Sequence, residues 1–412
     1  MQNGSRLELD SRVAEASRSV LDEVLREGAR RMLMAVLEAE VQAYVDCYAD
    51  QRDVEGHRLV VRNGRKPTRT LQSGTGPVEV SQPRVHDRRE AHRFQSAILP
   101  PYLRRTPSLE GLIPWLYLKG ISTNDFSDAL KSILGEGASG LSANTITRLK
   151  AAWEDEFKEW GNRDLRGKRY VYLWADGIYF NVRLTAERPC LLVVVGTLQD
   201  GTKELVAIQD GERESKLSWV ELLSDLKRRG LDDSPKLAVG DGALGFWSAL
   251  EEVFPRTRQQ RCWVHKTANI LDKLPKKLQA GAKKLIHEMY LAPCKKDART
   301  AFKEFCGRYQ AKYPKAVECL VKDQDTLFTF YDFPAEHWQH IRSTNVIEST
   351  FATVRHRHRQ TKGCGSRSAT LAMVFKLGRE AEKRWRRINA HELVEKVISG
   401  VKFEDGVQAE AA

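Results

Sequence analysis

The sequence lacks the features that would place the chain in a membrane or in an oxidising compartment. Its longest strongly apolar run, Leu191 to Val195, is far shorter than the roughly 18 residues that a membrane-spanning helix requires. The first residues, Met1 to Asp10, lack the basic start and apolar stretch of an export signal, and the 7 cysteines form no CxxC pair. We therefore expect a cytoplasmic protein with no disulfide framework and no membrane partner.

Acidic residues are also scarce relative to basic ones. The 412 residues include 67 lysines and arginines but 55 aspartates and glutamates, a formal net charge of +12, while 41% hydrophobic residues are enough for a folded core. The basic residues are concentrated in three stretches, at 58–105, 255–284 and 351–389. Any one stretch could be an ordinary solvated surface, but three in one chain favour a long footprint on DNA or RNA.

The N-terminal part has a helical pattern followed by an irregular one. Apolar residues at helical spacing predict a helical region before residue 58, and the glycine, proline and serine content that follows predicts irregular or short β structure. Two further helices are expected to begin near Ser122 and Ser142. They resemble a helix-turn-helix that would present Arg148 to DNA, but the long loop between them leaves a plain helical hairpin as an alternative.

From Arg169 the pattern becomes strand-like. Alternating residues on both sides of Asp176-Gly177 and of Asp200-Gly201 predict strands joined at those two turns. Helices and strands then alternate, which favours an α/β core, and a long helical stretch reads as an insertion within it. The expected elements are a helix at 215–229, a strand at 237–239, a helix at 244–253, a strand at 259–264 and helices over 266–330.

Three carboxylates are the candidate catalytic and metal-binding residues: Asp176, Asp241 and Glu348. Each has an ordinary alternative, namely a hairpin turn, a loop before a helix, and a capping box with Asn345. The two aspartates, however, adjoin very apolar strands, where an unpaired carboxylate is costly to desolvate. Carboxylates with no histidine or cysteine cluster nearby form a hard oxygen site. Such a site suits Mg²⁺ or Mn²⁺ and serves phosphoryl transfer.

The segment after Glu348 predicts a basic helix. It would begin near Ser343-Thr344-Asn345 and carry Arg355 two turns after Glu348, on the same face. One helix could then hold a metal ion and contact the DNA backbone, although a solvated basic helix is the alternative. The basic track continues with Arg357, Arg359 and Lys362.

Several runs of sequence, in their order and spacing, resemble the Mutator-type transposases of bacterial insertion sequences. The strongest are 240–246 (GDGALGF), 261–266 (RCWVHK) and 344–351 (TNVIESTF), with Arg355 beyond; 62–64 (RNG), 119–122 (KGIS) and 373–377 (MVFKL) extend the resemblance over most of the chain. The resemblance implies a mainly helical DNA-binding N-terminal region and an α/β ribonuclease H-like catalytic core interrupted by an α-helical insertion. It also implies that Asp176, Asp241 and Glu348 are a DDE metal-binding triad.

The implied function is that of a transposase. It would bind the terminal inverted repeats of its insertion sequence, cleave there by water attack, and join the released 3′-hydroxyl to target DNA. We expect Mg²⁺ or Mn²⁺, no nucleotide cofactor because no GxxxxGK[ST] loop is present, and a homo-oligomer on nucleoid DNA. A non-catalytic DNA-binding regulator and a nuclease that never joins ends are the alternatives.

The resemblance also divides the chain. We expect a helical region at 1–57, a basic irregular or short-strand segment at 58–110 and a helix-turn-helix-like DNA-binding region at 111–165. The core should comprise 166–265 and 336–412, and its second part, 336–412, should carry basic C-terminal helices. The helical insertion should lie between them, at 266–335.

Cys262 and His265 form a Cys-x-x-His pair. A structural zinc site needs about four protein ligands, and His287, Cys294 and Cys306 are poorly placed to complete one. The pair is better interpreted as a buried thiol with a hydrogen-bonded histidine. In the resembled family it is a signature after the second aspartate, which implies a part in shaping the active site or contacting DNA. Trp263 between them could stack on a distorted base or belong to the core.

Overall fold

The computed structural model describes residues 3–89, 92–106, 109, 116, 143–179, 190–211, 214–360 and 366–409, with the backbone alone at 3–19, 143–147, 353 and 355–360. The chain forms two compact units, Met1–Leu149 and Lys150–Ala412. The helix expected from Ser122 lies outside the described residues. In the part of the chain that is described, no helix is both long and apolar enough to span a membrane.

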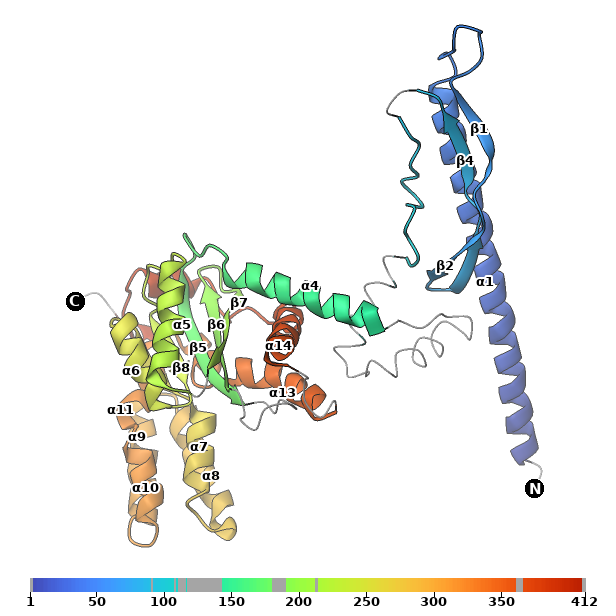
Figure 1. Cartoon of the computed structure of the whole chain (residues 1–412). Coiled ribbons are helices and arrows are strands. Elements are labelled where there is room, and N and C mark those ends of the chain that lie inside the picture. Colours follow the sequence, from blue (N-terminus) through green and yellow to red (C-terminus); the bar gives the residue numbers. More distant parts are fainter. Residues whose placement is uncertain are drawn as a thin grey trace. The chain divides into compact units, whose positions relative to one another are not determined.

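The N-terminal unit is a long helix that packs along two antiparallel strand pairs (Figure 1). Strand β1 pairs with β4, and β2 pairs with β3. Leu37 on the helix is fully buried with Leu71, Val78 and Val80 of the strands, because the apolar side of the helix covers the apolar side of this β structure. The elements are α1 Asn3–Cys47, β1 Val60–Arg65, β2 Arg69–Ser73, β3 Gly76–Val80 and β4 Pro83–Asp87.

The second unit is built on a five-stranded mixed sheet in the order β7-β6-β5-β8-β9. The first three strands along the chain pair antiparallel, and β8 and β9 add parallel to β5. Apolar, β-branched residues dominate the central strands, which are buried on both faces. The strands are β5 Tyr170–Tyr179, β6 Cys190–Leu198, β7 Lys203–Gly211, β8 Leu237–Gly240 and β9 Arg258–Arg261.

Helices cover both faces of this sheet, which confirms the α/β core in its coarse form. Side chains alternate along β5, so Leu173 and Ala175 pack with helices α5 and α6. Tyr172 points the other way and contacts His337. The covering helices, several of which are visible in Figure 1, are α5 Lys216–Arg228, α6 Leu244–Val253, α12 Trp338–Ile341, α13 Asn345–Gln360 and α14 Arg367–Glu382. Helix α4, Ala143–Gly161, contacts α14 through Phe157 and Trp160, which lie against Phe375.

A helical segment follows β9 and extends from one end of the sheet (Figure 1). Its interior is aromatic, with Trp263, Phe302, Phe328 and Tyr331 in ring contact. The segment comprises α7 Trp263–Leu271, α8 Lys276–Leu291, α9 Lys295–Tyr309, α10 Pro314–Val321 and α11 Gln324–Leu327. Short elements complete the chain: η1 Thr329–Asp332, η2 Ala335–His337, α15 Leu393–Ile398, β10 Phe403–Glu404 and β11 Val407–Gln408.

Two local expectations from the sequence are wrong. Asp176-Gly177 is not a turn, because β5 continues through it and Asp176 pairs with Val193 of β6. The strand expected at 259–264 stops at Arg261, where its parallel partner β8 also ends, and α7 begins at Trp263. The turn at Asp200-Gly201 is confirmed, and so is the start of α13 at Asn345.

Candidate functional site

Asp176 and Asp241 follow two residues that face each other across neighbouring strands. Ala175 of β5 pairs with Gly240 of β8 in parallel register. Asp176 continues β5, whereas Asp241 follows the last residue of β8, so the two aspartates lie at the same level of adjacent strands, which are about 4.8 Å apart. Asp176 is only 8% exposed. Asp241 is partly buried, and its Oδ1 accepts a hydrogen bond from the Ala243 N–H at 2.9 Å, which holds the loop before α6.

Glu348 is brought to the same place from the first turn of α13, which packs against β5 and β6. Burial raises the pKa of Asp176 to about 7, the nearby His265 opposes this, and the negative charges of Asp241 and Glu348 raise it further. A charge affects a pKa in this way only at short range. The three predicted carboxylates therefore lie near one another, although the ligand atoms that come within 4.8 Å of one another among the described residues are those of Cys262, His265 and Glu348.

Glu214 is a fourth carboxylate in this cluster, and the sequence analysis missed it. Burial raises the pKa of Glu214 to about 7, and the charges of Asp241 and Asp176 add to the effect. Glu214 lies just before Ser215, the N-cap of α5, in a segment without periodicity. Its only sequence signal was Gly177, which appeared to mark a turn but in fact leaves room for the Glu214 side chain.

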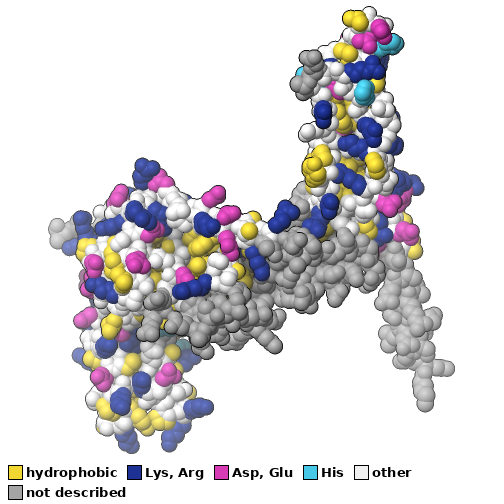
Figure 2. All heavy atoms as spheres, in the orientation of Figure 1, with side chains coloured by type: hydrophobic (Ala, Val, Ile, Leu, Met, Phe, Trp, Pro, Cys, Tyr) yellow, Lys and Arg dark blue, Asp and Glu magenta, His cyan; other side chains and the backbone are white. Residues whose placement is uncertain are grey.

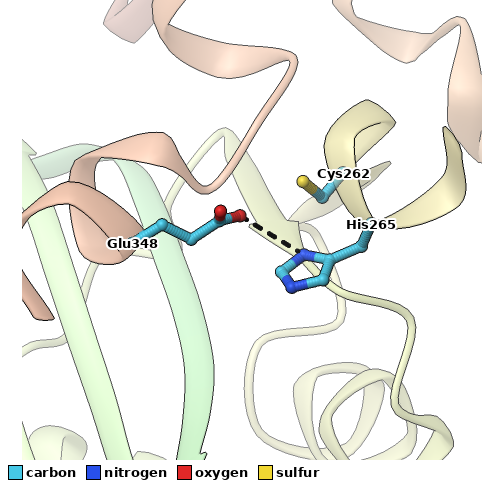
Figure 3. A group of neighbouring side chains, drawn as sticks. All are labelled: Cys262, His265 and Glu348. Atoms are coloured by element: carbon cyan, nitrogen blue, oxygen red, sulfur yellow. Dashed lines mark ion pairs between the residues drawn. The ribbon is translucent and has the colours of Figure 1, made fainter. Parts of the chain in front are cut away.

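Cys262 and His265 also adjoin the carboxylates, although no spacing of residues placed them there and only the family resemblance implied a part in shaping the site. His265 Nδ1 lies 3.6 Å from Glu348 Oε1, and Figure 3 shows the two side chains pointing toward each other with Cys262 beside them. The ligand atoms of Cys262, His265 and Glu348 all lie within 4.8 Å of one another. A hydrogen bond to Cys262 raises the pKa of His265 to about 9, so the imidazole is protonated at neutral pH.

Trp263 belongs to the core. It is 1% exposed, and its Nε1 donates to the Leu327 carbonyl oxygen at 2.8 Å. A side chain held in this way cannot stack on a DNA base, so the base-stacking interpretation is excluded for this structure.

The donor chemistry of the carboxylate cluster fits a hard divalent cation. Asp176, Asp241, Glu348 and Glu214 offer only oxygen ligands, and Asp176 and Glu214 have raised pKa values because burial and like charges disfavour their ionised forms. A divalent cation would relieve both effects. Oxygen ligands of this kind suit Mg²⁺ or Mn²⁺.

Comparison with known proteins settles the family. The model described as "Transposase, Mutator family" matches residues 2–388. The chain belongs to the Mutator family of transposases. It is 56% identical over 295 residues to the transposase for insertion sequence element IS6120 of Mycolicibacterium smegmatis, which covers 72% of this chain and 91% of that relative. It is 52% identical over 289 residues to the transposase for element IST2 of Acidithiobacillus ferrooxidans, with 68% and 95% covered.

This Mutator-family chain has a weak likeness to a solved structure, the HTLV-2 integrase catalytic core domain in complex with magnesium. The match covers 34% of this chain and 86% of that chain, with 15% identity and a TM-score of 0.17.

The predicted DNA contacts of this Mutator-family chain are only partly described. Arg148 is exposed on α4. Arg355, Arg357 and Arg359 lie on α13, where the backbone alone is described, and Lys362 lies outside the described residues. Figure 2 shows lysine and arginine side chains spread over the visible face of each unit, mixed with acidic ones. These contacts therefore stay predictions.

Proposed function

We propose that this Mutator-family transposase cleaves DNA at the terminal inverted repeats of its insertion sequence and joins the freed ends to target DNA. Asp176, Asp241 and Glu348 would hold divalent cations, Mg²⁺ or Mn²⁺, at a ribonuclease H-like core. The mixed sheet supports such a core, with three antiparallel strands followed in sequence by two parallel ones.

The observation that carries the proposal is the proximity of three acids from distant parts of the sequence, with Asp176 buried among them. Burial is the main cause of the raised pKa of Asp176, and the charges of Asp241 and Glu348 add to it. Burying like charges together is unfavourable, and turn or capping residues have no need of it. A cluster kept at this cost is typical of a functional site.

The chemistry requires no covalent enzyme intermediate. When bound, the cation would stabilise the negative charge that develops on the phosphate. Water attacks the phosphorus at the element end, the bond from phosphorus to the 3′ oxygen breaks, and a 3′-hydroxyl is released. That hydroxyl attacks a target phosphodiester in the same way, so one new bond forms for each bond broken.

The side chains of the cluster orient this reaction and regulate access to it. Asp176 pairs with Val193 of β6 and directly follows Ala175, the last β5 residue paired with β8, so its backbone is held in the sheet. Without a cation, the negative charge of this cluster would oppose the approach of a phosphate backbone. Basic residues elsewhere would hold the flanking DNA. The candidates are Arg148, Arg355, Arg357, Arg359 and Lys362.

Isosteric variants test the proposal. Asp176→Asn, Asp241→Asn and Glu348→Gln should each abolish Mg²⁺-dependent cleavage and strand transfer on inverted-repeat DNA while DNA binding persists. Asp225→Asn is the matched control, because Asp225 pairs with Arg229 on α5 and lies outside the cluster. Unchanged cleavage by the three cluster variants would overturn the triad assignment, and DNA binding without any cleavage by the wild type would make the chain a DNA-binding regulator instead. Cleavage without joining in the wild type would make it a nuclease.

A further inference from the structure

We propose that Cys262, His265 and Thr344 form a positioning group that fixes the orientation of Glu348. This inference rests on the proposed function, since it assigns to Glu348 the role of a cation ligand. It gives the Cys-x-x-His pair a defined task, which neither the sequence nor the family relationship supplies. The group acts through Glu348 and does not itself contact the reacting atoms.

Thr344 is the centre of the group. Its side chain is fully buried, and its Oγ1 donates a hydrogen bond to Glu348 Oε1 at 3.0 Å. His265 Nδ1 lies 3.3 Å from the same hydroxyl and 3.6 Å from the same carboxylate oxygen. The Thr344 hydroxyl, just before α13, donates to Oε1, and the His265 imidazole of α7 lies at ion-pair distance from it. Together they restrict rotation of the carboxylate about its last bond.

The backbone of Thr344 is fixed as well. The Glu348 N–H donates to the Thr344 carbonyl oxygen at 3.1 Å, so Thr344 holds Glu348 through both backbone and side chain. The Thr344 N–H in turn donates to Cys262 Sγ at 3.3 Å. Next to this contact, the Trp263 N–H donates to the Arg342 carbonyl oxygen at 3.0 Å. The start of α13 is therefore anchored to the start of α7.

The Thr344 hydroxyl has two possible acceptors, Cys262 Sγ and Glu348 Oε1. It lies 3.4 Å from Cys262 Sγ and 3.0 Å from Glu348 Oε1, but a hydroxyl has one proton to donate. A shorter contact to an ionised carboxylate is the stronger one. Cys262 is then satisfied by the Thr344 N–H and by His265, and the hydroxyl holds Glu348.

The spacing of the Cys-x-x-His pair follows from this arrangement. Cys262 is the N-cap residue of α7, and His265 is three residues later, so both side chains face Thr344. The intervening Trp263 points into the core, and Val264 is exposed. A shorter or longer spacing would turn the imidazole away from Glu348.

A soft metal such as Zn²⁺ is the alternative occupant of Cys262, His265 and Glu348, whose ligand atoms lie within 4.8 Å of one another. Two observations favour positioning. Three protein ligands are fewer than the usual four of a structural zinc site. The sulfur, imidazole and carboxylate also already exchange hydrogen bonds with Thr344, so they are held without a metal.

The test measures cation binding and cleavage in the full chain. Thr344→Val removes the hydroxyl but keeps the shape, and Thr344→Ser restores the hydroxyl. His265→Ala removes the imidazole, and His265→Asn keeps a donor near the Nδ1 position. Mn²⁺ titrations followed by electron paramagnetic resonance give the affinity, and cleavage rates against Mg²⁺ concentration give the half-maximal concentration. Thermal unfolding without metal and DNA binding serve as folding controls.

We expect Thr344→Val and His265→Ala to weaken Mn²⁺ binding and raise the half-maximal Mg²⁺ concentration roughly 10-fold or more, as loss of an outer-shell partner does. Thr344→Ser and His265→Asn should recover most of the loss. If Thr344→Val and His265→Ala depend on metal as the wild type does while Glu348→Gln is inactive, the positioning group is overturned. The proposed function then stands. Wild-type cleavage by Glu348→Gln overturns the proposed function itself. Co²⁺ added to the protein would absorb intensely if it bound the Cys262 thiolate, and Cys262→Ser would remove that absorption. This result overturns the positioning role in favour of a soft-metal site.

Discussion

The Glu214 carboxylate occupies the space in which any residue other than glycine at position 177 would place its Cβ. A Cβ built on Gly177 would lie 1.8 Å from Glu214 Oε1. Since Gly177 directly follows Asp176 on β5, the close approach places a fourth acid beside the proposed cation ligands. The size of residue 177 thus controls the charge of the cluster.

Gly177→Ala should impair catalysis far more than stability. The clash involves the far end of a flexible side chain, so Glu214 can move at a cost of about 1 kcal/mol or less in unfolding free energy. Displacing it disturbs the carboxylates beside it, and we expect a roughly 10- to 100-fold loss of cleavage, as small misplacements near reacting groups cause. Cleavage kinetics and thermal unfolding measure the two effects. Gly161→Ala is the control, because a Cβ there meets nothing within 4 Å. Cleavage by Gly177→Ala at the wild-type rate would refute the expectation.

Asp323→Ala should destabilise the second unit. Asp323 forms ion pairs with Arg261 and Lys266, which are 4% and 2% exposed, and the two cations would lose their shared partner. Leaving buried charges unpaired costs about 3 to 5 kcal/mol of unfolding free energy. Urea unfolding of the full chain measures this loss. Asp325→Ala, an exposed change on the same helix α11, should have almost no effect, and equal stability of the two variants would argue against the network.

Acid should destabilise the chain partly through His340. Burial lowers the pKa of His340 to about 4, and the charge of Lys203 adds to the effect. The unfolded side chain titrates near 6.5. Because the folded pKa is the lower one, this stabilisation is complete above pH 6.5 and is lost as the pH falls toward 4. The thermal midpoint of His340→Gln should therefore fall less between pH 7 and pH 4.5 than that of the wild type. An exposed His391→Gln control should follow the wild type, and parallel curves for all three would contradict the assignment.

The basic stretch at 58–105 should contribute phosphate contacts. Arg84, Arg93 and Arg104 are exposed there. Replacing all three with alanine should reduce the slope of log affinity against log salt by about 0.9 for each lost phosphate contact on duplex DNA. The control replaces three exposed cations of equal charge at Lys303, Arg308 and Lys312. Fluorescence anisotropy at several salt concentrations measures both slopes, and equal slopes would show that the stretch is only a solvated surface.

Helices marked by apolar periodicity or by an N-cap residue were predicted correctly from the sequence. Helix α6 occupies the expected 244–253, and α5 starts at its Ser215 cap as expected. The pattern misled at Asp176-Gly177, because an Asp-Gly pair between apolar residues also resembles a hairpin turn. Pairing with Val193 and Leu192 of β6 decides that position, and no short-range pattern reveals this pairing.

Only the part of the candidate site that adjoins the strands, namely the two aspartates, could be predicted from the sequence. The two aspartates adjoin strands that the α/β pattern places side by side, so their neighbourhood could be inferred. Glu214, Cys262 and His265 reach the cluster through tertiary packing of loops and helices, which no spacing in the sequence reveals. The roles of Asp176, Asp241 and Glu348 as cation ligands stay predictions.

The most direct test of the central claim is a change of metal preference at Asp241. A thiolate is a softer ligand than a carboxylate and binds Mn²⁺ better than Mg²⁺. Asp241→Cys should therefore fail to cleave inverted-repeat DNA in Mg²⁺ and recover cleavage in Mn²⁺, whereas the wild type works in both. Cleavage by Asp241→Cys at the wild-type rate in Mg²⁺ would contradict a role for Asp241 as a cation ligand.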